Sequence, residues 1–318
     1  MCGIFAVIGS REVSSLLIDG LRKLEYRGYD SAGIATIDNL NNDQIGQLNV
    51  TKAKGKLINL SNSIKKKPPK GHVGIAHTRW ATHGKPNERN AHPHLDFSGQ
   101  IAVVQNGIIE NYRDLSNSLK LKGIKLTSET DTEIIPHLIG LEIEHSLANG
   151  LSPNEQTLLI AVQKVLTLLE GTYSIAVIWS KAPNALVVAR GQAPLVLGFG
   201  EGEFFCASDT PALTGFTRTF LPLRDHESAL LTPLGIELFD DEGKRQHRAP
   251  SILEGTEFFA DKRNFRHFML KEIYEQPETA QQWIDRFLPM DLPLGNPIAL
   301  PVSKSILENI EQIQILAC

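Results

Sequence analysis

The feature that most constrains the fold of this chain is a dense series of strand signals between residues 173 and 240. Apolar runs of strand length follow one another there: YSIAVIW, ALVVAR, PLVLGF, FFCAS, SALLT and GIELFD. Gly, Pro, Asn and Asp separate these runs at short intervals, which is typical of antiparallel meanders rather than of βαβ units. The region therefore predicts antiparallel sheet.

The first half of the chain mixes strand and helix signals. Apolar runs predict strands at 4–9, 33–37, 72–78 and 101–105, and apolar residues at helical spacing predict helices at about 12–26, 111–122, 131–146 and 153–169. Thr130 and Glu133 have capping-box spacing at the start of the 131–146 helix. No glycine-rich nucleotide-binding motif follows a strand. We therefore expect an α+β fold with antiparallel sheets packed together and covered by helices.

Charge and cysteine content exclude several classes of partner. Lys and Arg total 32 against 36 Asp and Glu, which leaves a net charge of −4 and no basic field for nucleic acid or an anionic membrane. The one basic run, KKKPPK at 65–70, is typical of a solvated loop. No apolar stretch approaches the ~20 residues that span a bilayer, and the start lacks the basic region of a signal peptide. The cysteines (Cys2, Cys206, Cys318) fit neither a disulfide framework nor a metal motif. We expect a cytoplasmic protein.

The composition changes near residue 241. A charged, turn-rich segment is followed by aromatic residues without a sustained period and then by a proline-interrupted stretch. Ile306, Leu307, Ile310 and Ile313 have helical spacing, and IQILAC at 313–318 resembles a buried strand without a following partner. We expect one domain over 2–248, a linker over 249–300, and the start of a further domain, cut short, over 301–318.

Cys2 is the first candidate for chemistry. Initiator methionine is normally removed before a small residue, and removal would leave a thiol and a free α-amine on one residue. The amine has a pKa near ~7.7–8.0 and the thiol near ~8.5, so that at neutral pH part of the amine is free to act as a base. N-terminal-nucleophile enzymes use this arrangement. The alternative is that Cys2 is a small apolar residue at the start of a strand.

The motif HTRWATHG at 77–84 is the second candidate. Arg79 suits bidentate binding of a carboxylate, Trp80 suits closure over a small ligand, and Thr82 and His83 offer hydrogen bonds. The same residues also fit a strand end with a hydrogen-bonded histidine and a packed tryptophan. With NAHPH at 90–94 the histidines raise the possibility of a metal site, but the ligand spacing does not support one, and we expect no metal.

Two further motifs supply polar groups. In QNGIIENY (105–112), the Asn106 amide and the Gly107 N–H suit an oxyanion hole, although Asn-Gly is also a strong hairpin signal. In SETDTE (128–133), Asp131 suits either a helix start or an ammonium group. Together the candidates describe a thiol nucleophile, an oxyanion hole and sites for a carboxylate and an ammonium. The substrate that fits is glutamine.

The motifs CGIFAVIG, EYRGYDSAG, HTRWATHG, NAHPH, QNGIIENY and SETDTE, in this order, resemble the glutaminase domain of class II glutamine amidotransferases. The resemblance implies the N-terminal-nucleophile hydrolase fold, a four-layer α/β/β/α sandwich with two antiparallel sheets. It implies Cys2 as nucleophile, Asn106 and Gly107 as oxyanion hole, and Arg79 and Asp131 as ligands of the glutamine carboxylate and amine. Four residues are implied to line the same site in supporting roles: Trp80, Thr82, His83 and Arg27.

RHFMLKEIYEQPET at 266–279 resembles the branch of this family that leads into sugar-isomerase lobes. In that branch ammonia passes to fructose 6-phosphate, the enzyme is a homodimer and no cofactor is implied. We expect this chain to hold the glutaminase part alone and to be monomeric. The alternatives are another class II amidotransferase, such as an amidophosphoribosyltransferase, and a glutamine-binding fragment without turnover.

Overall fold

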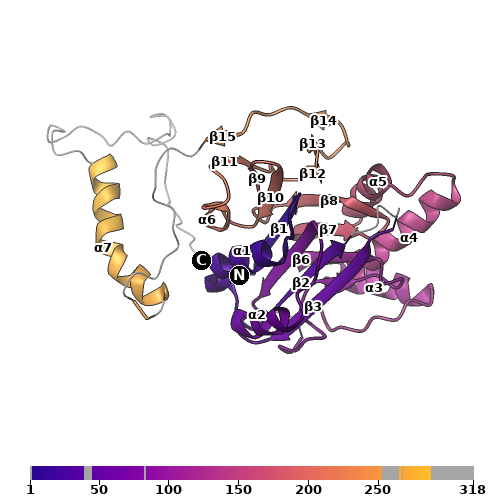
Figure 1. Ribbon diagram of the computed structural model, residues 1–318, viewed down its shortest axis with the longest axis horizontal. Coiled ribbons are helices and arrows are strands. Elements are labelled where there is room, and N and C mark those ends of the chain that lie inside the picture. The colour runs from indigo at the N-terminus through magenta and orange to yellow at the C-terminus, as the bar shows by residue number, and fades with distance from the viewer. Residues whose placement is uncertain (1, 39–44, 82–83, 253–264, 267, 288–318) are drawn as a thin grey trace, which may run out of the picture. The chain divides into compact units, whose positions relative to one another are not determined.

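The computed structural model describes residues 2–38, 45–81, 84–252, 265–266 and 268–287. The chain divides into two units, residues 1–260 and 261–318. The first unit contains two β-sheets and the helices that cover them (Figure 1). The described part of the second unit contains one helix, α7 (Phe268–Phe287).

The larger sheet begins and ends with edge strands from distant parts of the sequence. Every neighbouring pair in it is antiparallel. Within the described residues the strand order is β15 (Ser251–Ile252), β11 (Thr219–Pro222), β9 (Val196–Phe199), β10 (Glu203–Ala207), β1 (Gly3–Gly9), β4 (Val73–Arg79), β2 (Ser31–Asp38) and β3 (Gln47–Lys54). The first strand of the chain therefore lies in the middle of its sheet.

The smaller sheet is also antiparallel throughout. Over the same described part of the chain its order is β14 (Arg245–Gln246), β13 (Gly235–Phe239), β12 (Ser228–Thr232), β8 (Ala182–Gly191), β7 (Gly171–Trp179), β6 (Ile101–Ile109) and β5 (His94–Leu95). The strongest run of strand signals, from residue 171 onward, thus supplies strands to both sheets.

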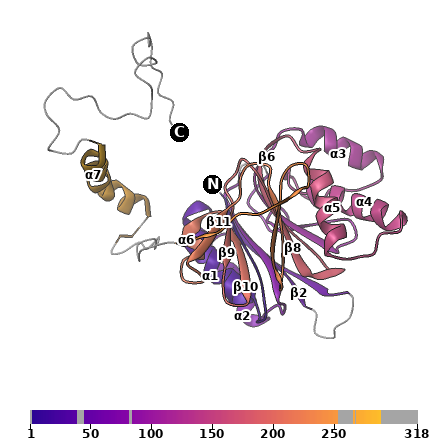
Figure 2. The same ribbon diagram turned by 90° about the horizontal axis from the view of Figure 1, so that it is seen from above.

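Helices cover the outer face of each sheet, as Figures 1 and 2 show. The larger sheet carries α1 (Ser14–Leu24), α2 (Leu57–Lys66) and α6 (Thr210–Leu213), and a 3-10 turn, η1 (Glu25–Arg27), follows α1. The smaller sheet carries α3 (Tyr112–Leu121), α4 (Ile134–Ala148) and α5 (Glu155–Leu166). The layers are therefore helix, sheet, sheet and helix, which confirms the expected α+β sandwich.

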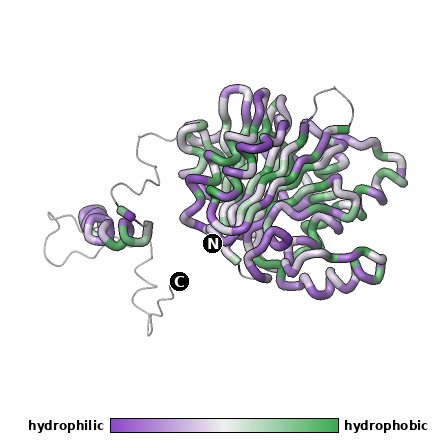
Figure 3. Tube along the Cα trace, turned by 60° about the horizontal axis from the view of Figure 1, so that its bottom comes forward, coloured by the Kyte–Doolittle hydropathy of each residue, from purple (hydrophilic) through white to green (hydrophobic). Residues whose placement is uncertain are grey.

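Strand β1 shows why an unbroken apolar run forms a strand here. All seven of its residues are buried. Ile4, Ala6 and Ile8 face the core between the two sheets, whereas Phe5 and Val7 face the core beneath the helices. Since successive side chains of a strand point to opposite faces, a strand covered on both faces needs apolar residues at every position. Figure 3 shows hydrophobic segments along the interior strands.

The helices expected from apolar spacing in the first half are present as α1, α3, α4 and α5. Strand β3 and helix α2 were not expected. Helix α2 ends at Lys66, so that it takes up the first two lysines of the basic run that suggested a loop. In the segment expected to be a linker, α7 forms a 20-residue helix that contains Pro277, a residue that normally disfavours helix interiors. The features expected at 288–318 lie outside the described residues.

Within the part of the chain that the structure describes, no helix is both long and apolar enough to cross a membrane.

Candidate active site

Cys2 lies immediately before β1 and is held against the end of β4. The backbone N–H of Trp80 donates to Cys2 Sγ at 3.3 Å, and the thiol donates to the Trp80 carbonyl at 3.5 Å. Burial raises the pKa of the Cys2 thiol, and the Trp80 N–H and the charges of Arg79 and Arg27 oppose this rise. At neutral pH the thiol therefore needs a base to become a nucleophile.

Asn106 lies on β6, in the neighbouring sheet, and reaches across to Cys2. Its side-chain Nδ2 donates to the Cys2 carbonyl oxygen at 3.2 Å. The hairpin alternative for Asn106–Gly107 is wrong, because β6 continues through both residues to Ile109 and pairs with β7 along its length. The amide is therefore aimed at the Cys2 residue from a strand, which is a rigid support.

Gly107 follows at a position that no other residue fits. Its φ is +106°, and a Cβ atom there would lie 1.9 Å from the carbonyl oxygen of Thr172. The glycine is also exposed, unlike Asn106 before it. Its peptide group is therefore accessible beside the Asn106 amide.

A buried column of three histidines, His77, His92 and His94, supports this region. We call it the histidine stack. The rings of His77 and His92 lie 4.1 Å apart and nearly parallel, and the His94 ring meets His92 edge-on at 4.9 Å. Burial lowers the pKa of His77 to about 3 and holds those of His92 and His94 well below the usual value. All three rings are thus neutral near pH 7.

Each member of the stack bonds to a different part of the candidate site. His77 Nε2 pairs with Asn106 Oδ1 at 3.1 Å, and since that oxygen only accepts, the nitrogen carries the proton. The N–H of Gln105 donates to His92 Nδ1 at 3.3 Å, and His94 Nε2 pairs with Thr130 Oγ1 at 3.0 Å. The sequence presented these histidines as candidate metal ligands or, in the 77–84 motif, as a histidine with its hydrogen bonds satisfied, but it did not predict which residues they would contact.

Asp131 lies in the segment that precedes α4. It is buried, and its Oδ2 accepts a hydrogen bond from the Ile109 N–H at 2.8 Å, just beyond Gly107 on β6. The expected capping pair of Thr130 and Glu133 is wrong. Glu133 itself precedes the helix without a side-chain cap, and its carboxylate accepts from the N–H groups of Thr127 and Ser128.

Burial disfavours the ionised form of Glu133, but hydrogen bonds from Thr127 and Ser128, with the His137 ring nitrogen 3.7 Å away, outweigh this effect and lower the pKa of its carboxyl group. A fixed negative charge therefore holds the 127–133 segment in a compact turn. This turn presents Asp131 toward β6.

Arg79 ends β4, directly before Trp80. Burial lowers the pKa of its guanidinium, and the charges of Asp131, Asp30 and Glu129, and of Cys2 when its thiol is ionised, oppose this effect. Those acidic groups are therefore close enough to Arg79 to act on it. Asp30 anchors the following residues, since its carboxylate accepts from the Ala81 N–H at 2.8 Å.

The other residues expected at the site are Trp80, Arg27, Thr82 and His83, and the structure describes only the first two. Trp80 is 45% exposed, and its ring meets that of Tyr29 edge-on at 5.7 Å. Arg27 pairs with Asp209 at 2.9 Å and donates to the Ser208 carbonyl at 3.3 Å. Thr82 and His83 lie outside the described residues.

The structure thus brings a thiol, a side-chain amide, a buried guanidinium and a buried carboxylate together between the ends of β1, β4 and β6. A nucleophile, an oxyanion site and paired recognition of a carboxylate and an ammonium are the elements of amide hydrolysis on an amino-acid side chain. Among the described residues, no group of three His, Cys, Asp or Glu side chains is arranged to hold a metal ion.

Comparison with known proteins agrees with this arrangement. Residues 77–215 match the family described as glutamine amidotransferase domain. The whole chain is 50% identical to the glutamine–fructose-6-phosphate aminotransferase (isomerizing) of Thermosynechococcus vestitus and covers 49% of it. It is 42% identical to the enzyme of the same name from Clostridium acetobutylicum and again covers 49%. The chain spans about half the length of the curated relatives that it matches.

Solved structures share the fold at lower identity. The glutamine phosphoribosylpyrophosphate amidotransferase of B. subtilis aligns with a TM-score of 0.62 at 24% identity, over 76% of this chain and 49% of that one. A structure titled as the allosteric regulatory enzyme of purine biosynthesis aligns with a TM-score of 0.64 at 25% identity, over the same shares. Both support the sandwich architecture of the first unit.

Proposed function

The chain contains a glutamine amidotransferase domain homologous to the N-terminal half of glutamine–fructose-6-phosphate aminotransferases, and from this premise we propose that it hydrolyses L-glutamine with Cys2 as the nucleophile. The observation that carries the proposal is the contact of Cys2 with two partners at once. Trp80 bonds to its sulfur, and the Asn106 amide bonds to its own carbonyl oxygen.

The reaction has two steps. After removal of Met1, the α-amine of Cys2 accepts the thiol proton, and the sulfur attacks the side-chain carbonyl carbon of glutamine. The negative charge on the carbonyl oxygen is stabilised by the Asn106 amide and the Gly107 N–H. The C–N bond breaks, the nitrogen takes the proton and leaves as ammonia, and water then hydrolyses the thioester to glutamate and free thiol.

The amino-acid end of glutamine is bound by groups of opposite charge. Arg79 binds the α-carboxylate through its fork of N–H donors, and Asp131 binds the α-ammonium. We propose supporting roles in glutamine binding for Trp80 and Arg27, and also for Thr82 and His83, which lie outside the described residues. Loss of one oxyanion donor in such a site costs about 3–4 kcal/mol of activation free energy.

The activity of the longer relatives extends this proposal. Their name implies transfer of ammonia to fructose 6-phosphate, and we propose this acceptor for a complete enzyme in which residues 2–248 form the glutaminase domain, 249–300 the linker and 301–318 the start of the isomerase part. We also propose a cytoplasmic location, which keeps the Cys2 thiol reduced, and a monomeric state for this chain on its own.

The test uses an electrophilic diazoketone analogue of L-glutamine. The analogue should label Cys2 covalently. The labelled protein should no longer release glutamate from glutamine. Cys2→Ala removes both effects, whereas Cys206→Ala is the matched control, because Cys206 is fully buried and burial raises the pKa of its thiol. Labelling that survives Cys2→Ala would contradict the mechanism.

Intact-mass measurement separates catalysis from binding alone. The catalytic proposal expects the mass of the chain without Met1, since a retained methionine would hold the Cys2 nitrogen in a peptide bond. A chain that keeps Met1 and binds glutamine without releasing glutamate would be a glutamine-binding fragment. Stimulation of glutamate release by phosphoribosyl pyrophosphate rather than by fructose 6-phosphate would favour the amidophosphoribosyltransferase type.

A further inference from the structure

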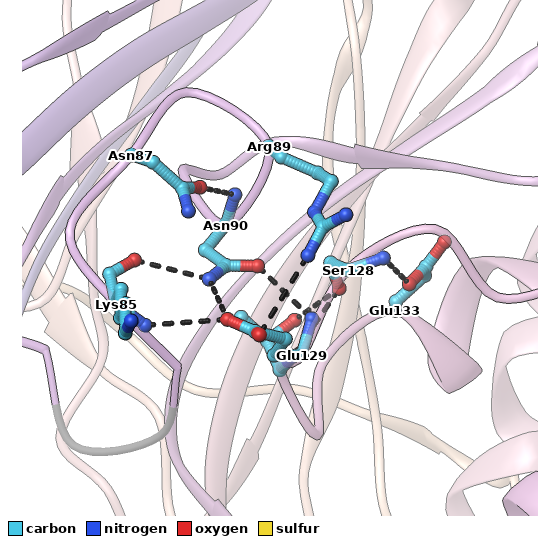
Figure 4. Close-up of polar contacts among 8 residues, drawn as sticks. Lys85, Asn87, Arg89, Asn90, Ser128, Glu129 and Glu133 are labelled. Carbon is cyan, nitrogen blue, oxygen red and sulfur yellow. Dashed lines mark hydrogen bonds and ion pairs between the residues drawn. The ribbon is translucent and has the colours of Figure 1, made fainter.

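Two loops that carry the proposed glutamine ligands are joined by side chains that the mechanism does not use. One of them is described from Gly84 to Asn90 and lies after Arg79 in the sequence. The other contains Glu129 and leads to Asp131. Figure 4 shows Asn90 and Glu129 pointing toward each other between these loops, with Lys85 and Arg89 around them.

The contacts between Asn90 and Glu129 run in both directions. Asn90 Nδ2 donates to Glu129 Oε2 at 2.8 Å, and the backbone N–H of Glu129 donates to Asn90 Oδ1 at 2.9 Å. Asn90 Nδ2 also donates to the Lys85 carbonyl at 3.0 Å. A side chain that both donates and accepts in these places must be an amide, because a carboxylate in place of Asn90 would lack the donors and face a like charge.

The surroundings hold the Asn90–Glu129 pair in a fixed geometry. Asn90 is fully buried, and its own backbone is fixed by Asn87, whose Oδ1 accepts from the Asn90 N–H at 2.8 Å. Gly84 packs against both partners, since a Cβ there would lie 2.7 Å from Asn90 Nδ2 and 3.0 Å from Glu129 Cβ, and its φ is +76°. The glycine leaves room for the two side chains to meet.

Each loop has a second hydrogen-bonded anchor close to the residue that is proposed to bind glutamine. Ala81, two residues after Arg79, is bonded to Asp30, and Asp131, two residues after Glu129, is bonded to the backbone of Ile109. The Asn90–Glu129 contact is therefore a direct hydrogen-bonded link between the loops. It joins the loop that begins after Arg79 to the loop that leads to Asp131 at a point away from those two anchors.

We propose that Asn90 and Glu129 are a positioning pair for glutamine recognition: they fix the spacing between the carboxylate-binding and ammonium-binding groups. The inference rests on the proposed function and adds to it two residues that touch no substrate. Loss of a pair that acts only by positioning should weaken the binding of ligands that contact both Arg79 and Asp131. It should leave the reactivity of Cys2 toward small reagents unchanged.

The experiment compares two labelling reactions of Cys2 in the full chain. The diazoketone analogue of L-glutamine carries both the α-carboxylate and the α-amine, whereas iodoacetamide carries neither. In Asn90→Asp and Glu129→Ala we expect the labelling rate constant for the analogue to fall about tenfold, the size expected for loss of a charge-assisted hydrogen bond. The rate constant for iodoacetamide should stay within about twofold of the unchanged chain.

Glu129→Gln is the rescue variant, because the bonds from Asn90 Nδ2 and the Lys85 N–H both end on one oxygen, which the amide retains. It should label with the analogue nearly as fast as the unchanged chain. Arg89→Ala is the matched control, since Arg89 is exposed and pairs with Glu129 only at 3.7 Å. This variant should not change either rate.

The outcomes separate the two proposals. If the unchanged chain is not labelled by the analogue, the proposed function fails. If it is labelled, but Asn90→Asp and Glu129→Ala label equally fast, the positioning pair is refuted. If the variants slow labelling by both reagents equally, the fold has loosened in general. If Glu129→Gln does not restore the labelling rate, the effect comes from the lost charge. Either result also overturns the inference.

Discussion

The histidine stack predicts how the stability of the first unit depends on pH. In the folded chain burial lowers the pKa of His77 to about 3 and holds those of His92 and His94 well below 6.5. In the unfolded chain each ring regains its usual pKa of about 6.5. Below that value the unfolded state binds more protons than the folded state, so the free energy of unfolding falls as the pH falls.

The magnitude follows from the linkage relation. Between about pH 7 and about pH 5.5, protonation of one unfolded histidine lowers the free energy of unfolding by about 1.2 kcal/mol, while the folded ring stays neutral. Three rings give about 4 kcal/mol, a large share of the ~5–15 kcal/mol that stabilises an ordinary domain. Glu133 adds little in this window, because its ordinary pKa is 4.5 and its folded pKa lies lower still.

Urea unfolding followed by circular dichroism at the two pH values measures this difference. His92→Phe keeps an aromatic ring between its neighbours and removes one titrating group, so its pH-dependent loss should be about a third smaller. His145→Gln changes an exposed histidine and should leave the loss as it is. A free energy of unfolding that stays constant between the two pH values, or a loss that His92→Phe does not reduce, would refute the reasoning.

Further predictions concern Gly107, with Gly123 as its comparison, and Arg79 and Trp179. Gly107→Ala should lower the free energy of unfolding by about 3 kcal/mol or more, because its Cβ would lie 1.9 Å from the Thr172 oxygen; Gly123→Ala, at a φ of +82° with no neighbouring atom, should cost only about 1 kcal/mol in the same urea titration. Arg79→Lys should raise the KM for glutamine by about tenfold or more in a glutamate-release assay, because one ammonium cannot replace the fork; an unchanged KM would remove Arg79 from the site. Trp179→Ala should cost about 3–5 kcal/mol in thermal or urea unfolding, since this side chain is 2% exposed in the core.

Much of the sandwich was predictable because its central strands are covered on both faces. Such strands must be apolar at every position, as the GIFAVIG run of β1 is, and the amphipathic spacing of α1 or α5 identifies helices that cover them. Strand β3 escaped prediction because it is a half-exposed edge strand in which polar residues are tolerated. Helix α2 escaped because its buried Leu57, Leu60 and Ile64 precede a lysine run that suggested a loop.

The candidate site was predictable to the extent that its chemistry resides in single residues. Cys2, Arg79, Asn106 and Asp131 carry a thiol, charged groups or a hydrogen-bonding amide, and the structure places them in one region between the two sheets. The roles of His77 and Asn90 depend instead on which distant partner each side chain meets, 29 residues away for His77 and 39 for Asn90. Local spacing contains no information on such partners, and capping-box spacing was misleading for the same reason.

The central place of β1 has a consequence for how the protein is made. One of its neighbours, β4, lies within the first 79 residues, but the other, β10, ends at Ala207. At about 5–20 residues per second, a ribosome needs roughly ten to forty seconds to deliver that second neighbour. Throughout this interval the residue ahead of Cys2 is open to an aminopeptidase, while the apolar strand behind it is open to aggregation. The interval that would permit maturation of the nucleophile is therefore also the interval in which the nascent chain most needs a chaperone.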